Sequence, residues 1–255
     1  MIKYEAMKLT PIKTPVIRRG DNLWPIINRA FSDISEASVV VVTSKIISLC
    51  QRQTVLKVKD KYELVKQEAD LYLDRSLSIY RMAIAIKNNT LAVNAGIDES
   101  NADGYFLLWP KDLQETTNEI WRRLRKKFRL NQLGVIVTDS HSLPLRWGII
   151  GTSLCHCGFK ALWDRRREKD LFGHLIKITQ VNVAEALAAS AVLVMGEVAE
   201  QTPLCLIEEA GMVQFQNRVP SPAELERLRL TPESDIYAPI LTAAPWQKGG
   251  ASKGK

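Results

Sequence analysis

The sequence predicts a mixed α/β (α+β) protein, because strand-like and helix-like segments follow one another without an internal repeat. Residues 38–44 form a continuous apolar run rich in β-branched side chains, which is typical of a buried strand. Residues 78–96 indicate two strands joined at Asn88 and Asn89, since Asn tolerates the left-handed backbone of a tight hairpin turn. Residues 181–196 carry small apolar side chains at helical spacing. We therefore expect buried strands, a hairpin and packed helices.

Two further helices are predicted between these segments. Residues 62–73 have apolar side chains at helical spacing. A longer helix is expected to begin at Asp112 as N-cap, with Glu115 three residues later as in a capping box, and to run to about Leu130.

The second half of the chain predicts two more strands. Residues 133–139 form another apolar run, which is expected to end at Asp139. Gly196 is expected to stop the helix of residues 181–196, and residues 203–208 to follow as a strand.

Composition favours a cytoplasmic protein that does not enter a membrane. The N-terminal residues lack the apolar core of a signal peptide, and the apolar run of residues 181–196 contains Glu185 and is too short to span a bilayer. The four cysteines are expected to be reduced. Cys155-His156-Cys157 lacks the second pair that a structural zinc site needs, so no zinc is inferred.

The net charge of +7 is compatible with nucleic acid or with small anionic substrates. Six basic residues lie in residues 122–129, where Ile120, Leu124 and Phe128 recur at helical spacing. This pattern favours an amphipathic helix with a basic solvent face, and no nucleic-acid partner is predicted. A nucleic-acid binder remains the last-ranked alternative. A second basic cluster, residues 165–167, lies in a polar loop.

Three apolar runs finish in polar residues, and strand ends are where binding sites gather in such sheets. These polar ends are residues 43–45, 94–101 and 138–141. Together they supply a lysine, two aspartates and several hydroxyls, which suits a metal-bound phosphate. We expect Asp98 and Asp139 to form the two halves of a metal site. The alternative is that both aspartates cap turns and that Lys45 is an ordinary surface lysine.

Two other patterns are rejected. Residues 249–255 satisfy G-x-x-x-x-G-K, but no strand precedes them and no helix follows, so they are not a P-loop. His141, His156 and His174 are far apart in sequence, and no nucleophile motif supports an amidase.

Seven motifs follow one another along the chain: "TPVIRRGDNL", "VVVTSKIIS", "NAGIDESN", "GVIVTDSHSLPLRWGIIG", "DLFGHLIKIT", "VAEALAASAVLVMGE" and "TPLCLI". This series resembles the coenzyme F420-0:L-glutamate ligase family, the γ-glutamyl ligases that build the poly-glutamate tail of a deazaflavin cofactor. The resemblance covers residues 14 to 207. It implies a γ-glutamyl ligase-like fold, with residues 9–210 as the catalytic unit, made of one domain or of two intertwined subdomains. Residues 211–255 then form a C-terminal extension, frayed from about Trp246 onward.

The resemblance also implies a set of site residues. Two divalent ions, Mg²⁺ or Mn²⁺, would be held by Asp98, Asp139, Ser140 and Glu197. GTP, with K⁺ as a possible aid, would contact a set of residues from four motifs: Thr14, Pro15, Val16, Ile17, Ser44, Lys45, Asn101, Met195 and Gly196. Lys45 and Arg146 would steady charge on the transferred phosphoryl group.

The implied reaction joins L-glutamate to an acceptor carboxylate through an acyl phosphate made from GTP, in a homodimer. The acceptor is F420-0 or, as in the folate γ-glutamyl ligase-like branch, a folate. The chain departs from the family pattern at residues 51–52, 142–143 and 184–186, which puts the acceptor in more doubt than the reaction. A nucleotide-binding relative that has lost ligase activity is the alternative.

Overall fold

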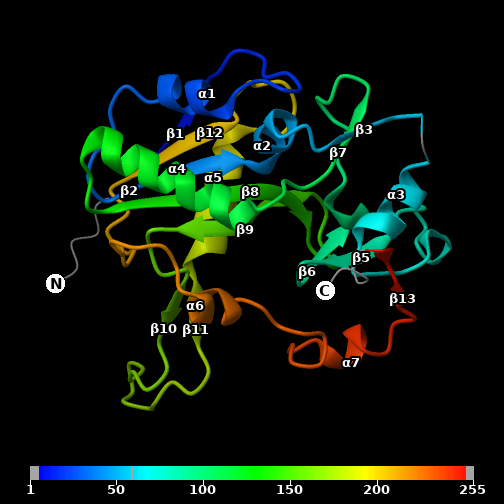
Figure 1. Cartoon of the computed structure of the whole chain (residues 1–255). Coiled ribbons are helices and arrows are strands. Elements are labelled where there is room, and N and C mark those ends of the chain that lie inside the picture. The colour runs from blue at the N-terminus through cyan, green and yellow to red at the C-terminus, as the bar shows by residue number, and fades with distance from the viewer. Residues whose placement is uncertain (1–5, 59, 251–255) are drawn as a thin grey trace.

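The computed structural model describes residues 6–58 and 60–250, and its largest element is a five-stranded sheet in the order β1-β12-β2-β8-β9 (Figure 1). The strands of this main sheet are β1 Lys8–Ile12, β2 Ser38–Thr43, β8 Leu133–Ser142, β9 Ile149–Cys157 and β12 Leu204–Glu208. Only β2 and β8 run parallel, while the other neighbours pair antiparallel. The mixed α+β class is confirmed.

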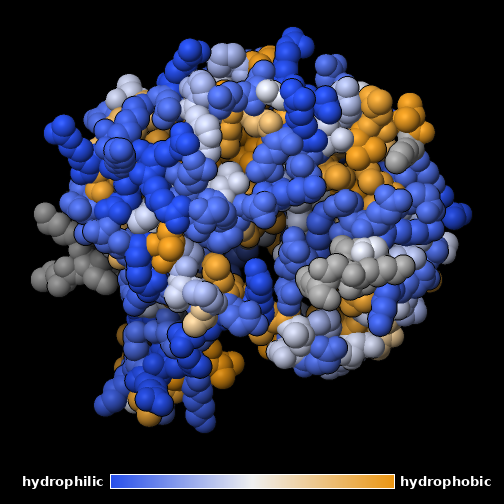
Figure 2. Space-filling model, in the orientation of Figure 1, coloured by the Kyte–Doolittle hydropathy of each residue, from blue (hydrophilic) through white to orange (hydrophobic). Residues whose placement is uncertain are grey.

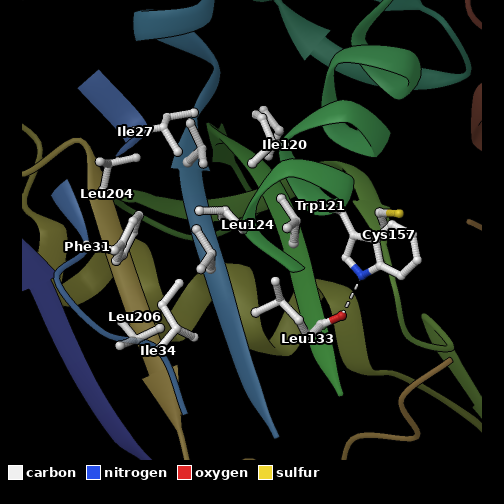
Figure 3. Packing of buried hydrophobic residues seen from close by; sticks show 14 of the residues in the cluster. Ile27, Phe31, Ile34, Ile120, Trp121, Leu124, Leu133, Cys157, Leu204 and Leu206 are labelled. Atoms are coloured by element: carbon white, nitrogen blue, oxygen red, sulfur yellow. Dashed lines mark hydrogen bonds between the residues drawn. The ribbon is translucent and has the colours of Figure 1, made fainter. Parts of the chain in front are cut away.

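Helices cover both faces of the main sheet, which explains why the middle strands are apolar without alternation. The helices are α1 Leu23–Ala30, α2 Ser44–Cys50, α4 Leu113–Phe128 and α5 Val183–Met195. Val40 and Val42 of β2 join the core under α1, α2 and α4 (Figure 3), whereas Val39 and Val41 join the core with α5. Trp121 anchors the first core, because its indole N–H donates to the Leu133 carbonyl over 2.7 Å.

The segment between α2 and α4 forms a second, smaller region with its own core. It contains β3 Thr54–Leu56, α3 Lys61–Glu68, β4 Leu71–Tyr72, β5 Ile84–Lys87, β6 Thr90–Val93 and β7 Tyr105–Leu107, with single turns of 3-10 helix at Arg75–Leu77 and Asn94–Gly96. Asn88 and Asn89 both have positive φ between β5 and β6, so the predicted hairpin is confirmed. The predicted helix of residues 62–73 is too long, because Leu71 and Tyr72 pair with β5 instead.

The two long helices test the capping predictions. Asp112 has left-handed φ and ψ values of 47° and 41° and makes no cap hydrogen bond, so the predicted capping box is wrong. An N-cap side chain needs an extended backbone to reach the first amides of the helix. Glu115 pairs with Arg122 instead, over 2.6 Å. The end of α5 at Gly196, where φ is 78°, is confirmed.

The basic face of α4 is largely engaged within the chain. Arg123 pairs with Glu119 over 2.6 Å, and the Lys127 ammonium donates to two backbone carbonyls near the end of α1. Ile120 and Leu124 are buried on the opposite side, as the spacing predicts. This face therefore has a structural explanation.

The remaining strands and helices lie outside the main sheet. The strands β10 Leu162–Asp164 and β11 Gln180–Asn182 form a projecting hairpin. The C-terminal helices are α6 Pro222–Glu226 and α7 Ala238–Leu241. All four cysteines are free thiols. Among residues 6–58 and 60–250, no helix is both long and apolar enough to cross a membrane.

The C-terminal segment, residues 211–250, runs from the main sheet to the second region (Figure 1). There Gln247–Lys248 form β13, which pairs with β4. The Gly249 amide donates to the Asp70 carbonyl over 3.0 Å, and a Cβ at Gly249 would lie 2.1 Å from the Ala69 carbonyl oxygen. The predicted fraying is therefore wrong for residues 246–250, while residues 251–255 lie outside the described part.

Candidate active site

A cleft of about 260 Å³ lies where β2 ends, beside Thr138, Asp139 and Ser140 of β8. The two strands are parallel and in register, with Thr43 opposite Thr138. Their carboxyl ends therefore meet at one edge of the sheet, as the polar strand ends predict. Lys45 follows β2 on the first turn of α2, and Asp139 follows Thr138 on β8, so both side chains line the cleft.

Most of the residues expected to contact nucleotide or metal line this same cleft. Those that do are Thr14, Pro15, Val16, Ile17, Lys45, Asn101, Asp139, Ser140, Met195, Gly196 and Glu197. Ser44 is expected there too, but it is buried within α2. Asp98 does not line the cleft itself and reaches it through Lys45.

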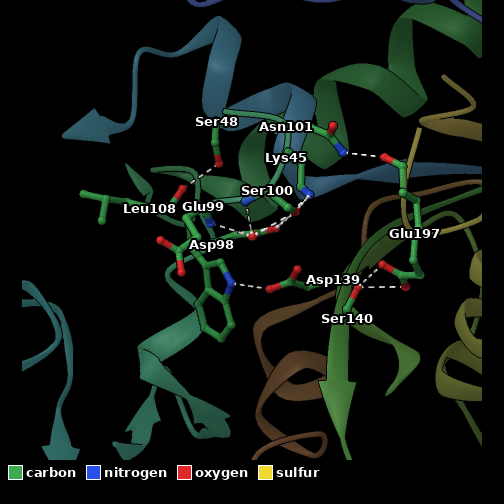
Figure 4. A network of polar contacts seen from close by, with 12 residues as sticks. Lys45, Ser48, Asp98, Glu99, Ser100, Asn101, Leu108, Asp139, Ser140 and Glu197 are labelled. Carbon is green, nitrogen blue, oxygen red and sulfur yellow. Dashed lines mark hydrogen bonds and ion pairs between the residues drawn. The ribbon is translucent and has the colours of Figure 1, made fainter. Parts of the chain in front are cut away.

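Asp98 is held by a dense set of donors (Figure 4). The Lys45 ammonium lies 2.7 Å from Asp98 Oδ2 and also donates to Ser100 Oγ over 2.8 Å. Asp98 Oδ1 accepts from the backbone N–H groups of Glu99 and Ser100 over 2.5 and 2.8 Å. Burial raises the pKa of Asp98, but Lys45 and the two amides outweigh it and hold that pKa below its ordinary value.

Asp139 lines the cleft and has fewer donors than Asp98 (Figure 4). The indole N–H of Trp109 donates to Asp139 Oδ2 over 2.6 Å. Loss of water around the carboxylate raises the pKa of Asp139 to about 6, and the charge of Asp98 adds to this rise. The Trp109 indole and the Ser140 amide only partly offset it. The protein groups around Asp139 therefore do not fully compensate the negative charge of its carboxylate.

Glu197 and Asn101 form the opposite rim. Glu197 follows Gly196, the residue at which α5 ends. Ser140 Oγ donates to the carboxylate of Glu197 and lies 2.9 and 2.8 Å from its two oxygens (Figure 4). The Asn101 amide donates to the Val198 carbonyl over 2.6 Å. The Thr14 N–H donates to the Gln201 carbonyl over 2.9 Å. These bonds join parts of the chain that are far apart in sequence into one wall.

The structure does not bring Arg146 into the cleft. The prediction that the strand ends at Asp139 is wrong, because β8 continues to Ser142 and pairs with β9 along that length. The turn at residues 143–148 therefore lies beyond the cleft and is exposed. There the Arg146 guanidinium donates to the neighbouring Leu145 carbonyl over 2.9 Å.

Trp109 is a site residue that the sequence motifs did not reveal. Its ring packs against Gly96, where an added Cβ would lie 2.2 Å from the indole. The Lys87 ammonium lies 5.5 Å from the ring centroid. These contacts fix the indole N–H on Asp139. No local pattern around "LLWP" indicates this role, because the three partners come from separate elements.

The donor set suits a hard divalent cation in its chemistry. Asp139, Ser140 and Glu197 present oxygen atoms to one cleft, and the poorly compensated Asp139 would gain from a cation. Thr138 Oγ1 is also buried in the cleft wall, and no residue among 6–58 and 60–250 forms a hydrogen bond with it. Within the described residues, however, no three His, Cys, Asp or Glu side chains are arranged closely enough to hold one ion by themselves. Any ion here would need further ligands, as phosphate oxygens supply.

An α+β fold with a cleft beside two parallel strands, lined by apolar and charged side chains, is typical of proteins that bind small molecules. The F420-0:gamma-glutamyl ligase family model matches residues 11–209. The chain therefore belongs to the F420-0:gamma-glutamyl ligase family, whose enzymes form γ-glutamyl amide bonds.

Relatives from methanogens agree with this assignment. The coenzyme F420:L-glutamate ligase of Methanocaldococcus jannaschii is 30% identical over 236 residues, covering 85% of this chain and 93% of the relative. The protein of the same name from Methanopyrus kandleri is 29% identical, covering 87% and 93%. That from Methanococcus maripaludis strain S2 is 32% identical, covering 72% and 80%.

Proposed function

We propose that this chain is a GTP- and divalent-metal-dependent γ-glutamyl ligase that adds L-glutamate to a carboxylate-bearing cofactor, F420-0 or a folate. The observation that carries the proposal is a cleft lined by Lys45, Asp139 and Glu197 in a chain of the F420-0:gamma-glutamyl ligase family. Eleven of the residues expected to contact nucleotide or metal border that cleft.

The chemistry requires an activated acceptor. An oxygen of the acceptor carboxylate attacks the γ-phosphorus of GTP, the bond to the β–γ bridging oxygen breaks, and GDP leaves. The glutamate amine then attacks the acyl carbon, loses a proton, and displaces inorganic phosphate. Both steps ask the protein mainly for positioning and charge neutralisation.

Each residue of the cleft has a role in this scheme. Lys45 contacts the γ-phosphate as a point charge once nucleotide draws it from Asp98. Asp98, Asp139 and Glu197, with Ser140, would hold Mg²⁺ or Mn²⁺ together with phosphate oxygens, and the ion would supply charge neutralisation on the phosphates. The segment Thr14–Ile17, Asn101 and the end of α5 at Met195 and Gly196 border the nucleotide.

The test is product analysis. Purified protein is incubated with GTP, MgCl₂ and L-glutamate, together with F420-0 or tetrahydrofolate monoglutamate, and the products are analysed by mass spectrometry. We expect one acceptor to gain one glutamyl residue, which is roughly 129 Da. GDP release should depend on both the acceptor and glutamate. GTP binding without glutamate addition to either acceptor would instead identify a nucleotide-binding relative that has lost ligation.

We also propose that the protein is a homodimer. Large apolar side chains are exposed at two turns. At the β8–β9 turn, Leu145 and Trp147 are 95% and 92% exposed. On the β10–β11 loop, Leu171 and Phe172 are 100% and 85% exposed. Exposed apolar groups of this size favour a protein partner. Light scattering after gel filtration should give twice the chain mass. The substitution Trp147→Ser should lower the measured mass towards that of one chain. A monomeric wild-type protein would refute the proposal.

A further inference from the structure

Two more cavities lie next to the cleft and share lining residues with it or with each other. A small cavity of about 60 Å³ shares Asp139 and Ser140 with the cleft. A large cavity of about 760 Å³ adjoins the small one, since both are lined by Thr90, Trp109, His141 and Thr152. The face in Figure 2 is hollowed between the main body and the second region. A molecule in the large cavity could therefore extend one end past Trp109 to Asp139.

The lining of the large cavity suits a flat, polar-edged molecule. Five of its lining residues carry side-chain amides: Asn88, Asn89, Gln114, Asn118 and Asn182. Trp109 adds an aromatic side chain, while Leu225 and Leu228 of the C-terminal segment add apolar surface. Amides donate and accept hydrogen bonds, and aromatic and apolar side chains cover ring faces. Its volume lies within the usual 300–1,000 Å³ range of pockets for small molecules and cofactors.

The small cavity suits a narrower group. At about 60 Å³ it is far smaller than the large cavity, and a carboxylate is a group of suitable width. His141 is half-buried there, and its ring makes no hydrogen bond to any residue in the described part of the chain. Thr152 presents a hydroxyl that is bonded to Glu185 over 2.9 Å. The small cavity thus offers the His141 imidazole to a carboxylate tail, whereas the Thr152 hydroxyl already donates its proton to Glu185.

We infer that the large cavity binds the heterocyclic body of the acceptor, and that its carboxylate tail passes Trp109 and His141 to meet the γ-phosphate beside Asp139. The nucleotide and the acceptor would then approach Asp139 from opposite sides. This inference rests on the proposed function for the identity of the reaction. It adds that Leu225, Leu228 and Arg229 of the C-terminal segment help select the acceptor.

The test fills the large cavity without touching the cleft. Leu225→Trp places an indole in the cavity, and Leu225→Phe is a smaller graded change. Leu230→Trp is the matched control, because Leu230 lies in the same segment, is 53% exposed and does not line the cavity. Circular dichroism and thermal melting establish that each variant is folded.

Equilibrium binding of F420-0 and of tetrahydrofolate monoglutamate is measured by fluorescence, without GTP or glutamate, so the outcome does not depend on turnover. We expect Leu225→Trp to raise the Kd of the binding probe at least tenfold, Leu225→Phe to raise it less, and Leu230→Trp to leave it within twofold. The Kd for GTP should stay unchanged in all three. Unchanged acceptor binding in a folded Leu225 variant, or no binding of either probe to the wild type, would overturn the inference. Absence of ligase activity with these shifts intact would overturn only the proposed function.

Discussion

The loop of residues 94–101 and strand β8 each hold one aspartate near Lys45, yet the surroundings of the two carboxylates differ. Asp98 in the loop receives an ammonium and two backbone amides, and its pKa is lowered. Asp139 on β8 receives mainly one indole N–H, and its pKa is raised to about 6. The charge of Asp98 is thus compensated by groups of the protein itself, whereas the charge of Asp139 is compensated only in part.

This difference indicates which residue depends on a ligand. A buried carboxylate without a compensating cation costs stability, and such groups gather at functional sites. A divalent ion beside Asp139 would remove that cost. Asp98, by contrast, is already neutralised by Lys45 and can exchange this partner when phosphate draws the lysine away.

Removal of the Asp139 carboxylate should have the largest effect. In Asp139→Ala, glutamate-dependent GDP release should fall by about 10³-fold or more, because the proposed metal site would lose one of its ligands. Glu226→Ala, at an exposed acid on α6, is the control and should keep full activity. Turnover that survives in Asp139→Ala would show that the metal assignment is wrong.

The next effect is on the stability of metal-free protein. Because the folded pKa of Asp139 lies above its ordinary value of 3.8, the folded state binds more protons between pH 4 and 6, and stability falls as pH rises through this window. Asp139→Asn should be as stable as wild type near pH 4 and more stable by at most about 3 kcal/mol at pH 7. Urea denaturation in EDTA measures this difference, and equal stability at pH 7 would contradict it.

Lys45 links the two aspartates and should matter somewhat less. In Lys45→Met, kcat/KM for GTP should fall by roughly 10²-fold, since a point charge on the phosphates is lost and Asp98 loses its main partner. Lys126→Met, at an exposed position on the solvent face of α4, serves as the matched control. Steady-state kinetics at several GTP concentrations distinguish a binding loss from a loss in kcat.

The smallest effect should come from Asp98→Asn in metal-free protein. The pKa of Asp98 is lowered in the folded state, so its stabilisation is present above its ordinary pKa and is lost as pH falls through the folded pKa. The Asp98 side chain is 37% exposed, so at pH 7 the variant should lose only about 1 kcal/mol. A gain in stability would mean that the two aspartates do not differ as described.

The sequence predicted the parts of this site that depend on local pattern. The apolar run ending at Thr43 and the run containing Thr138 are strands, and their parallel pairing brings Lys45 and Asp139 together. Packed helices and the Asn88-Asn89 hairpin were also predicted, since spacing and turn chemistry are local properties.

The parts that were missed depend on pairing between distant segments. The length of β8 beyond Asp139 is set by β9, and this pairing carries Arg146 away from the cleft. Trp109 acts on Asp139 only because Gly96 leaves room for its ring. Neither fact can be read from the residues next to it in the chain.

The pairing of β13 with β4 has a mechanical consequence. The second region leaves and re-enters the main body through two neighbouring connections, at the ends of α2 and before α4, and such an arrangement could act as a hinge. The C-terminal segment adds a third tether on another side, tied by the β13–β4 ladder and by the Asn89 amide, which donates to the Leu230 carbonyl over 3.0 Å. The two regions are thus held together at a third place, which opposes a hinge motion between them. A cut within residues 231–245 would release this tether and let the hinge move.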